Sequence, residues 1–159
     1  MDFSFFSWKK NEAVFVVSVL LILFGISYFQ LKIGQMKARD AQRKADVELV
    51  GRALDQYLLD NKILPPSKNG MIVSCGNKGL DACVWGEGPI VDTLGISYLK
   101  KIPQDPFTYQ GRTYVYEVDL SHNKYRISIS LEYKGDISWR HDLTTQCGNG
   151  VQCSWYVQN

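Results

Sequence analysis

The sequence predicts an α+β fold in which a long N-terminal helix packs on a small antiparallel β-sheet. Three observations support it: an uncharged apolar run near the N-terminus, the absence of proline from Glu12 to about Asn61, and strand-like alternation after residue 110. We expect four segments along the chain: a short leader-like segment at residues 1–11, a transmembrane helix at 12–33, its amphipathic continuation at 34–62, and a globular β domain at 63–159.

The apolar run, AVFVVSVLLILFGISYF, extends from Ala13 to Phe29 without a charged residue. Its length is at the lower end of what a membrane-spanning helix needs. A cleaved signal peptide usually has a shorter apolar core followed by small residues, whereas bulky Tyr28 and Phe29 end this run. The run therefore predicts an uncleaved membrane helix.

The second half of the predicted helix carries one apolar stripe at helical spacing. Such a stripe should bury against the downstream domain. Its members are Val47, Val50, Leu54, Tyr57, Leu58 and Asn61. The helix should stop before Pro65 and Pro66, because proline cannot continue it.

Between the apolar run and the stripe lies KARDAQRKAD, residues 37–46. Asp40 precedes Arg43 by three residues and Lys44 by four, and Arg43 precedes Asp46 by three, all favourable spacings for ion pairs on one helix. Arg39 and Arg43 form a like-charge exception. We interpret the segment as a solvated, self-paired helix face. The acidic residues and the lack of aromatic side chains argue against a nucleic-acid contact.

Small residues recur on another face of the same helix. Close packing of a second helix is one interpretation, and the good helix propensity of alanine is the other. The residues are Gly34, Ala38, Ala41 and Ala45.

The four cysteines form two close pairs, Cys75 with Cys83 and Cys147 with Cys153. Neither pair has zinc-ribbon spacing, so local disulfides in an oxidising compartment fit better than metal binding, and four free thiols remain the alternative. Three connectivities are open to four cysteines. The basic residues around the apolar run favour the opposite topology, a cytoplasmic C-terminal domain, because more of them follow the run than precede it.

The downstream chain reads as loops and strands. Residues 67–88 are loop-rich, and 94–102 form a short helix or an extended segment. Residues 112–119 and 124–133 alternate with a period of two around a polar turn, which predicts a hairpin, and 136–143 could add a third strand. No nucleophile, metalloprotease or nucleotide-binding motif occurs, so we do not expect an enzyme.

Two segments resemble the type IV pilins and the major pseudopilins of type II secretion. ARDAQRKADVELVGRALDQYLLDN (38–61), followed by Pro65, is similar to the family's helix, and YLKKIPQDPF (98–107), followed by Tyr114, is similar to its conserved loop. The resemblance implies a pilin-like fold and a filament subunit, major or minor. It also implies an extracytoplasmic C-terminal domain, contacts with other pilin-like subunits and the inner-membrane assembly machinery, and a final location at the cell surface.

The resemblance also implies a processing site for prepilin peptidase and N-methylation of the mature chain. Glu12 matches the glutamate at the family's fifth mature position, which makes Trp8 the first mature residue. Ser7 stands where the family has glycine before the cleavage site. In the family, the glutamate pairs with the N-terminus of a neighbouring subunit.

We expect no cofactor, with one reservation. Some major pseudopilins bind calcium in the loop after the sheet, and the segment at Asp136 is similar to part of that loop, with Asp142 as a second oxygen donor. The alternative to a filament subunit is a membrane-anchored binding module. In that hypothesis the loop with Cys75, Cys83 and Trp85 is exposed and contacts a ligand.

Overall fold

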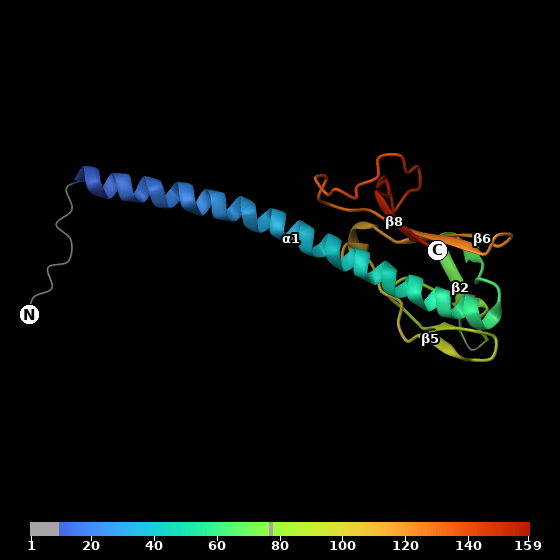
Figure 1. Ribbon diagram of the computed structural model, residues 1–159. Coiled ribbons are helices and arrows are strands. Elements are labelled where there is room, and N and C mark those ends of the chain that lie inside the picture. Colours follow the sequence, from blue (N-terminus) through green and yellow to red (C-terminus); the bar gives the residue numbers. More distant parts are fainter. Residues whose placement is uncertain (1–9, 77) are drawn as a thin grey trace, which may run out of the picture. The chain divides into compact units, whose positions relative to one another are not determined.

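The computed structural model of the protein describes residues 10–76 and 78–159 (Figure 1). The chain divides into two units, Met1–Lys37 and Ala38–Asn159, and α1 (Lys10–Asn61) contributes to both. The architecture is α+β, as predicted: one long helix followed by small antiparallel sheets.

In the first unit, the described residues are helical and most of their large apolar side chains are exposed. By length and composition, α1 is the one element of the described chain that is long and apolar enough to cross a membrane. Leu21, Phe24 and Phe29 are each about two-thirds exposed, which would be costly in water and suits a segment surrounded by lipid.

The helix ends through its own backbone and two prolines. Lys62 adopts a left-handed conformation with φ of 63°, and its N–H donates to the Leu58 carbonyl at 2.9 Å, which closes the last turn. Asn61 Nδ2 donates to the Tyr57 carbonyl at 3.1 Å. Pro65 and Pro66 then direct the chain into the first strand.

Among the described residues, the strands form three small antiparallel sheets, β1–β2–β3, β4–β5 and β6–β7–β8. Their bounds are β1 (Ser67–Lys68), β2 (Met71–Cys75), β3 (Asp81–Ala82), β4 (Ile90–Val91), β5 (Ser97–Leu99), β6 (Val115–Asp119), β7 (Lys124–Ile129) and β8 (Trp155–Gln158), with a 3₁₀ turn η1 (Thr108–Gln110) before β6.

The predicted hairpin is present as β6 and β7, in register from Val115 opposite Ser128 to Asp119 opposite Lys124. The extended alternative holds for part of 94–102, where β5 forms. The third strand predicted at 136–143 is wrong. That segment turns back on itself, and β8 at the C-terminus pairs with β7 instead.

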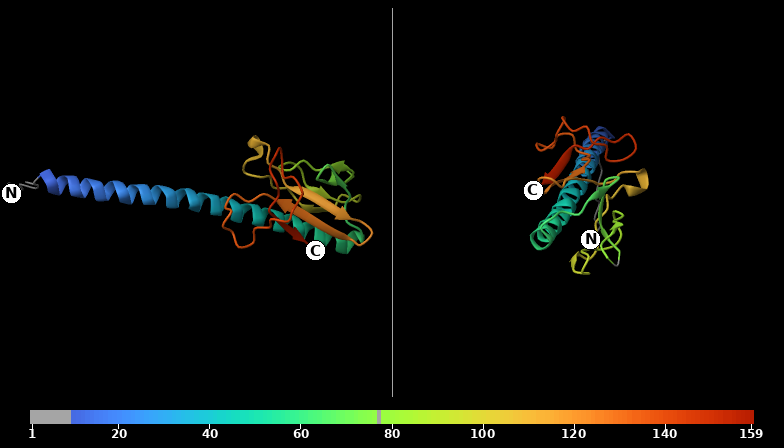
Figure 2. Two further views of the ribbon diagram at one scale, coloured as in Figure 1. Left: turned by 90° about the horizontal axis from the view of Figure 1, so that it is seen from above. Right: turned by 90° about the vertical axis from the view of Figure 1, so that its right-hand side faces the viewer.

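The core of the second unit lies between α1 and the strands, which run alongside it in Figures 1 and 2. Gly51 marks a close approach, because a Cβ atom there would lie 2.9 Å from the Tyr125 hydroxyl of β7. The helix contributes Val47, Val50, Leu54 and Tyr57 to the buried cluster, with Leu58 packed against it, and the strands contribute Ile72, Ile90, Tyr116, Tyr125, Ile127 and Ile129.

Candidate functional site

The predicted processing residues lie at the N-terminal end of the chain. Ser7 and Trp8 are outside the described residues. Glu12 lies in the first turn of α1 and its side chain is exposed.

The small residues occupy an exposed face of α1. Gly34 is exposed in the first unit, and a Cβ atom placed on it would meet nothing within 4 Å. In the second unit Ala38, Ala41 and Ala45 are all exposed. Ala41 precedes the buried Val50 by about two and a half helical turns, so the three alanines lie opposite the buried face of the second unit. None of the residues that the structure describes covers these three alanines.

The charged segment between them is not a solvated face, contrary to the prediction. The side chain of Arg43 is 0 % exposed and Asp40 is 2 % exposed. Of the three pairs read from the sequence, one forms: Arg43 Nη1 donates to Asp40 Oδ1 at 2.8 Å. Lys44 instead binds Asp136, and Asp46 accepts from the Tyr114 hydroxyl at 3.0 Å.

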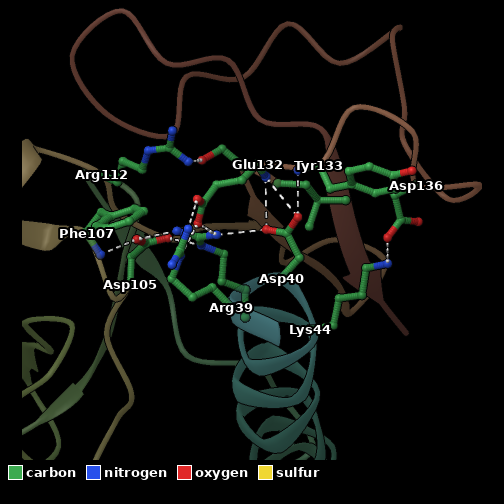
Figure 3. A network of polar contacts seen from close by, with 12 residues as sticks. Arg39, Asp40, Lys44, Asp105, Phe107, Arg112, Glu132, Tyr133 and Asp136 are labelled. Atoms are coloured by element: carbon green, nitrogen blue, oxygen red, sulfur yellow. Dashed lines mark hydrogen bonds and ion pairs between the residues drawn. The ribbon is translucent and has the colours of Figure 1, made fainter. Parts of the chain in front are cut away.

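Arg43 is the centre of a buried ion network. Its partners Asp40, Asp105 and Glu132 are labelled in Figure 3. Its Nε and Nη2 donate to the two carboxylate oxygens of Asp105 at 2.7 and 3.2 Å, and its Nη1 also donates to Glu132 Oε1 at 2.6 Å. Arg39 makes a second two-point contact with Glu132, at 2.9 and 2.6 Å. The like-charge pair Arg39 and Arg43 is therefore bridged by a carboxylate from the segment after β7.

Asp40 completes the network through backbone donors. Its carboxylate accepts from the N–H of Glu132 at 2.9 and 3.0 Å and from the N–H of Tyr133 at 2.8 Å (Figure 3). Asp105 likewise accepts from the N–H of Phe107 at 2.7 Å. The helix thus fixes two distant loops, at 105–107 and at 132–133, through side chains in two successive turns.

An aromatic ring covers one side of the network. The guanidinium carbons of Arg39, Arg43 and Arg112 lie 4.9, 5.5 and 5.7 Å from the centre of the Phe107 ring. Such contacts strengthen when water is excluded. Arg112 also donates to the Ser130 hydroxyl at 3.3 Å.

The network shifts the pKa of Arg43 and the pKa of Glu132 toward the charged forms of these two groups. Burial by itself would lower the pKa of Arg43, but hydrogen bonds to Asp105 and Glu132 outweigh it and raise that pKa. Burial would raise the pKa of Glu132, but Arg39 and Arg43 outweigh it and the pKa is lowered. Both groups therefore stay ionised, and the network is a set of charges held together in a buried setting.

Asp105 and Glu132 were not identified from the sequence as partners of the helix. The one signal that could have found them is the Arg39–Arg43 spacing, since two like charges on adjacent turns need carboxylates from elsewhere. No local pattern could have said which carboxylates these are.

Both expected disulfides are present, joining Cys75 to Cys83 and Cys147 to Cys153. The described residues contain no free cysteine. The binding-module hypothesis requires Trp85 to be part of an exposed contact surface, and it is not. It is 7 % exposed, its Nε1 donates to the Gly70 carbonyl at 3.2 Å, and its ring packs against Tyr114.

The chain matches the family described as type II secretion system (T2SS), protein G over residues 31–135, which is more than half of its length. No curated protein and no solved structure matches it. The matched segment contains the small residues from Gly34 to Ala45 and every member of the Arg43 network. The turn at Asp136 and the second disulfide both lie beyond the end of this segment.

Proposed function

The chain belongs to the family of type II secretion system protein G, and from this premise we propose that it is a structural subunit of a pseudopilus-like filament that assembles by helix–helix packing. The family is structural, and its members assemble with other pilin-like subunits. The observation that carries the assembly mode is the exposed face of α1 formed by Gly34, Ala38, Ala41 and Ala45.

Small side chains let two helix backbones approach closely, which increases the van der Waals contact between them. The buried face of the same helix is already occupied by its own domain, from Arg43 to Tyr57. Two exposed leucines, Leu49 and Leu59, continue the uncovered side of the helix in the second unit. A neighbouring helix would cover apolar surface that the monomer leaves in water.

In this proposal the subunits are held in the membrane before they assemble. The apolar half of α1 holds the chain in the cytoplasmic membrane, and the domain with two disulfides lies outside, where an oxidising compartment preserves them. Assembly machinery in the membrane would pass subunits into the filament after a prepilin peptidase has acted before Trp8. Glu12 would then pair with the N-terminus of the adjacent subunit.

Cysteine crosslinking tests the helix contact. Single Ala38→Cys and Ala45→Cys variants are expected to crosslink between subunits in intact filaments, and the native cysteines will not interfere because both pairs are disulfide-bonded. Lys68→Cys, an exposed position on β1 and not on the helix, is the control.

A second pair of variants tests whether the helices of neighbouring subunits pack against each other at Ala41 or only lie near each other. Ala41→Leu should reduce filament yield, because the larger side chain holds the helices apart, and should leave the fold intact, because Ala41 is exposed. Gln42→Leu adds the same side chain one residue further on, about 100° around the helix, and should assemble normally. If neither cysteine variant crosslinks and Ala41→Leu assembles like Gln42→Leu, the helix is only a tether and the proposal is wrong.

A further inference from the structure

A second anchor joins α1 to the segment after β7, outside the Arg43 network. Residues 136–139 form a tight turn in which the Trp139 N–H donates to the Asp136 carbonyl at 3.0 Å. The Asp136 carboxylate accepts from the N–H and the hydroxyl of Ser138 at 2.8 and 2.7 Å. Ile137 projects from the tip, is 101 % exposed and adds no apolar packing, whereas Trp139 at the end of the turn packs against the core.

The polar side of the turn, at Asp136 and Ser138, is held by a cation from the helix. Lys44 Nζ lies 2.7 Å from Asp136 Oδ2 (Figure 3). It also lies 2.8 Å from the Ser138 hydroxyl oxygen. The ammonium also lies 5.7 Å from the centre of the Trp155 ring of β8. Both charged side chains are about three-quarters buried, with exposed fractions of 24 % for Lys44 and 23 % for Asp136. Oxygen atoms from two residues and one aromatic face thus surround a single positive charge.

These residues do not fit a calcium ion. A calcium site needs six to eight oxygen ligands, and the described residues contain no group of three histidine, cysteine or acidic side chains that could hold a metal. Asp142, the second donor expected from the sequence, is exposed. The ammonium of Lys44 already lies within hydrogen-bond distance of the Asp136 oxygen that would bind the metal.

We propose that Lys44 is the resident cation of the Asp136 turn, so that the turn is ordered by an ammonium group of this chain and needs no divalent metal. An ammonium donates directed hydrogen bonds to the Asp136 carboxylate and the Ser138 hydroxyl, which is the ordering that a bound metal would otherwise supply. It is also covalently attached, so its occupancy does not depend on the concentration of any ion. This inference concerns the fold of one turn and is independent of whether the chain forms filaments.

Hydrogen exchange on the full chain in detergent micelles tests the proposal. The readout is the exchange rate of the peptide spanning residues 133–142, which includes the Ser138 N–H that donates to Asp136. Lys44→Met removes the charge and keeps most of the side chain, and it should speed exchange of this peptide roughly tenfold, because a partly buried charge-assisted contact is lost. Lys134→Met, at an exposed lysine in the same segment, should leave the rate unchanged.

The metal arm uses the unaltered protein with calcium chloride at about 10⁻³ M, the weak end of known protein calcium sites, or with a chelator. The exchange rate of the 133–142 peptide and the Tm of the protein should be the same with calcium as with chelator. Slower exchange or a higher Tm with calcium than with chelator would show that a metal orders the turn and would overturn the proposal. So would a Lys44→Met variant that exchanges no faster than Lys134→Met.

Discussion

Replacing Arg43 by methionine should strongly destabilise the second unit. The substitution keeps a long apolar side chain in a fully buried position but removes the guanidinium. Three carboxylates, those of Asp40, Asp105 and Glu132, then remain close together with exposed side-chain fractions of 3 %, 1 % and 10 %. Arg39 still contacts Glu132, but no described cation contacts Asp105.

The magnitude follows from what is left unpaired. Removing one partner of a buried ion pair costs about 3–5 kcal/mol, because the remaining charge has lost both water and its counter-ion. Glu132 keeps its two hydrogen bonds from Arg39, and Asp40 keeps those from the N–H groups of Glu132 and Tyr133. Most of the cost therefore falls on Asp105, and we expect a loss of about 3–4 kcal/mol. A domain of this size has a total stability on the order of 5–15 kcal/mol.

The assay is urea unfolding of the full chain in detergent micelles at pH 7, followed by near-ultraviolet circular dichroism. Arg52→Met makes the same change at an exposed arginine on the same helix and should alter the unfolding free energy by no more than about 0.5 kcal/mol. Arg43→Lys keeps the charge without the two-point geometry and should lie between the two. If Arg43→Met and Arg52→Met lower the unfolding free energy by the same amount, the buried ion network does not stabilise the fold.

Three further predictions use the same unfolding measurement. Leu54→Ala, in the core, should cost about 2–5 kcal/mol, whereas Leu59→Ala, on the exposed face, should stay within about 0.5 kcal/mol; equal losses would contradict the assigned faces. Hydrogen bonds from Lys44 and Ser138 lower the pKa of Asp136 from 3.8 to about 2, so its contribution is complete above pH 4 and is lost as pH falls toward 2. Asp136→Asn should therefore remove about 1–2 kcal/mol at pH 7 and very little at pH 2, and a loss that is independent of pH would refute this. Gly51→Ala should be destabilising by about 1 kcal/mol despite alanine's higher helix propensity, because its Cβ would lie 2.9 Å from the Tyr125 hydroxyl, and stabilisation would show that the ring moves freely.

The sequence predicted those features that depend on local periodicity and on residues that end a helix or form a turn. The helix stripe at Val47, Val50 and Leu54 has the spacing of one face, and the structure buries these residues against the sheets. The end of the helix before Pro65 and the β6–β7 hairpin are likewise local, since proline chemistry and period-two alternation act within a few residues. The two disulfides join cysteines that are close in sequence.

Features that depend on partners far along the chain were predicted wrongly or not at all. Asp40 and Arg43 have helix spacing that suits a solvated pair, and nothing local distinguishes that pair from a buried one. Their burial depends on Asp105 and Glu132, which are 62 and 89 residues from Arg43. The error at 136–143 has the same origin, because the Asp136 turn forms around Lys44, 92 residues earlier. Trp85 lies in a loop, as predicted, but it is buried there and not exposed, and only contacts with Gly70 and Tyr114 explain its burial.

In the proposed function, residues 37–46 serve both folding and assembly. Asp40 and Arg43 face the domain, whereas Ala38, Ala41 and Ala45 face away from it, because a helix turns by about 100° per residue. The two roles should therefore separate by mutation. Variants of Arg43 should lower the stability of the domain and should reduce assembly only through that loss, whereas Ala41→Leu should reduce assembly at unchanged stability. If Ala41→Leu destabilises the domain as much as it reduces assembly, the exposed face has no role of its own, and the proposed packing surface must lie elsewhere on the subunit.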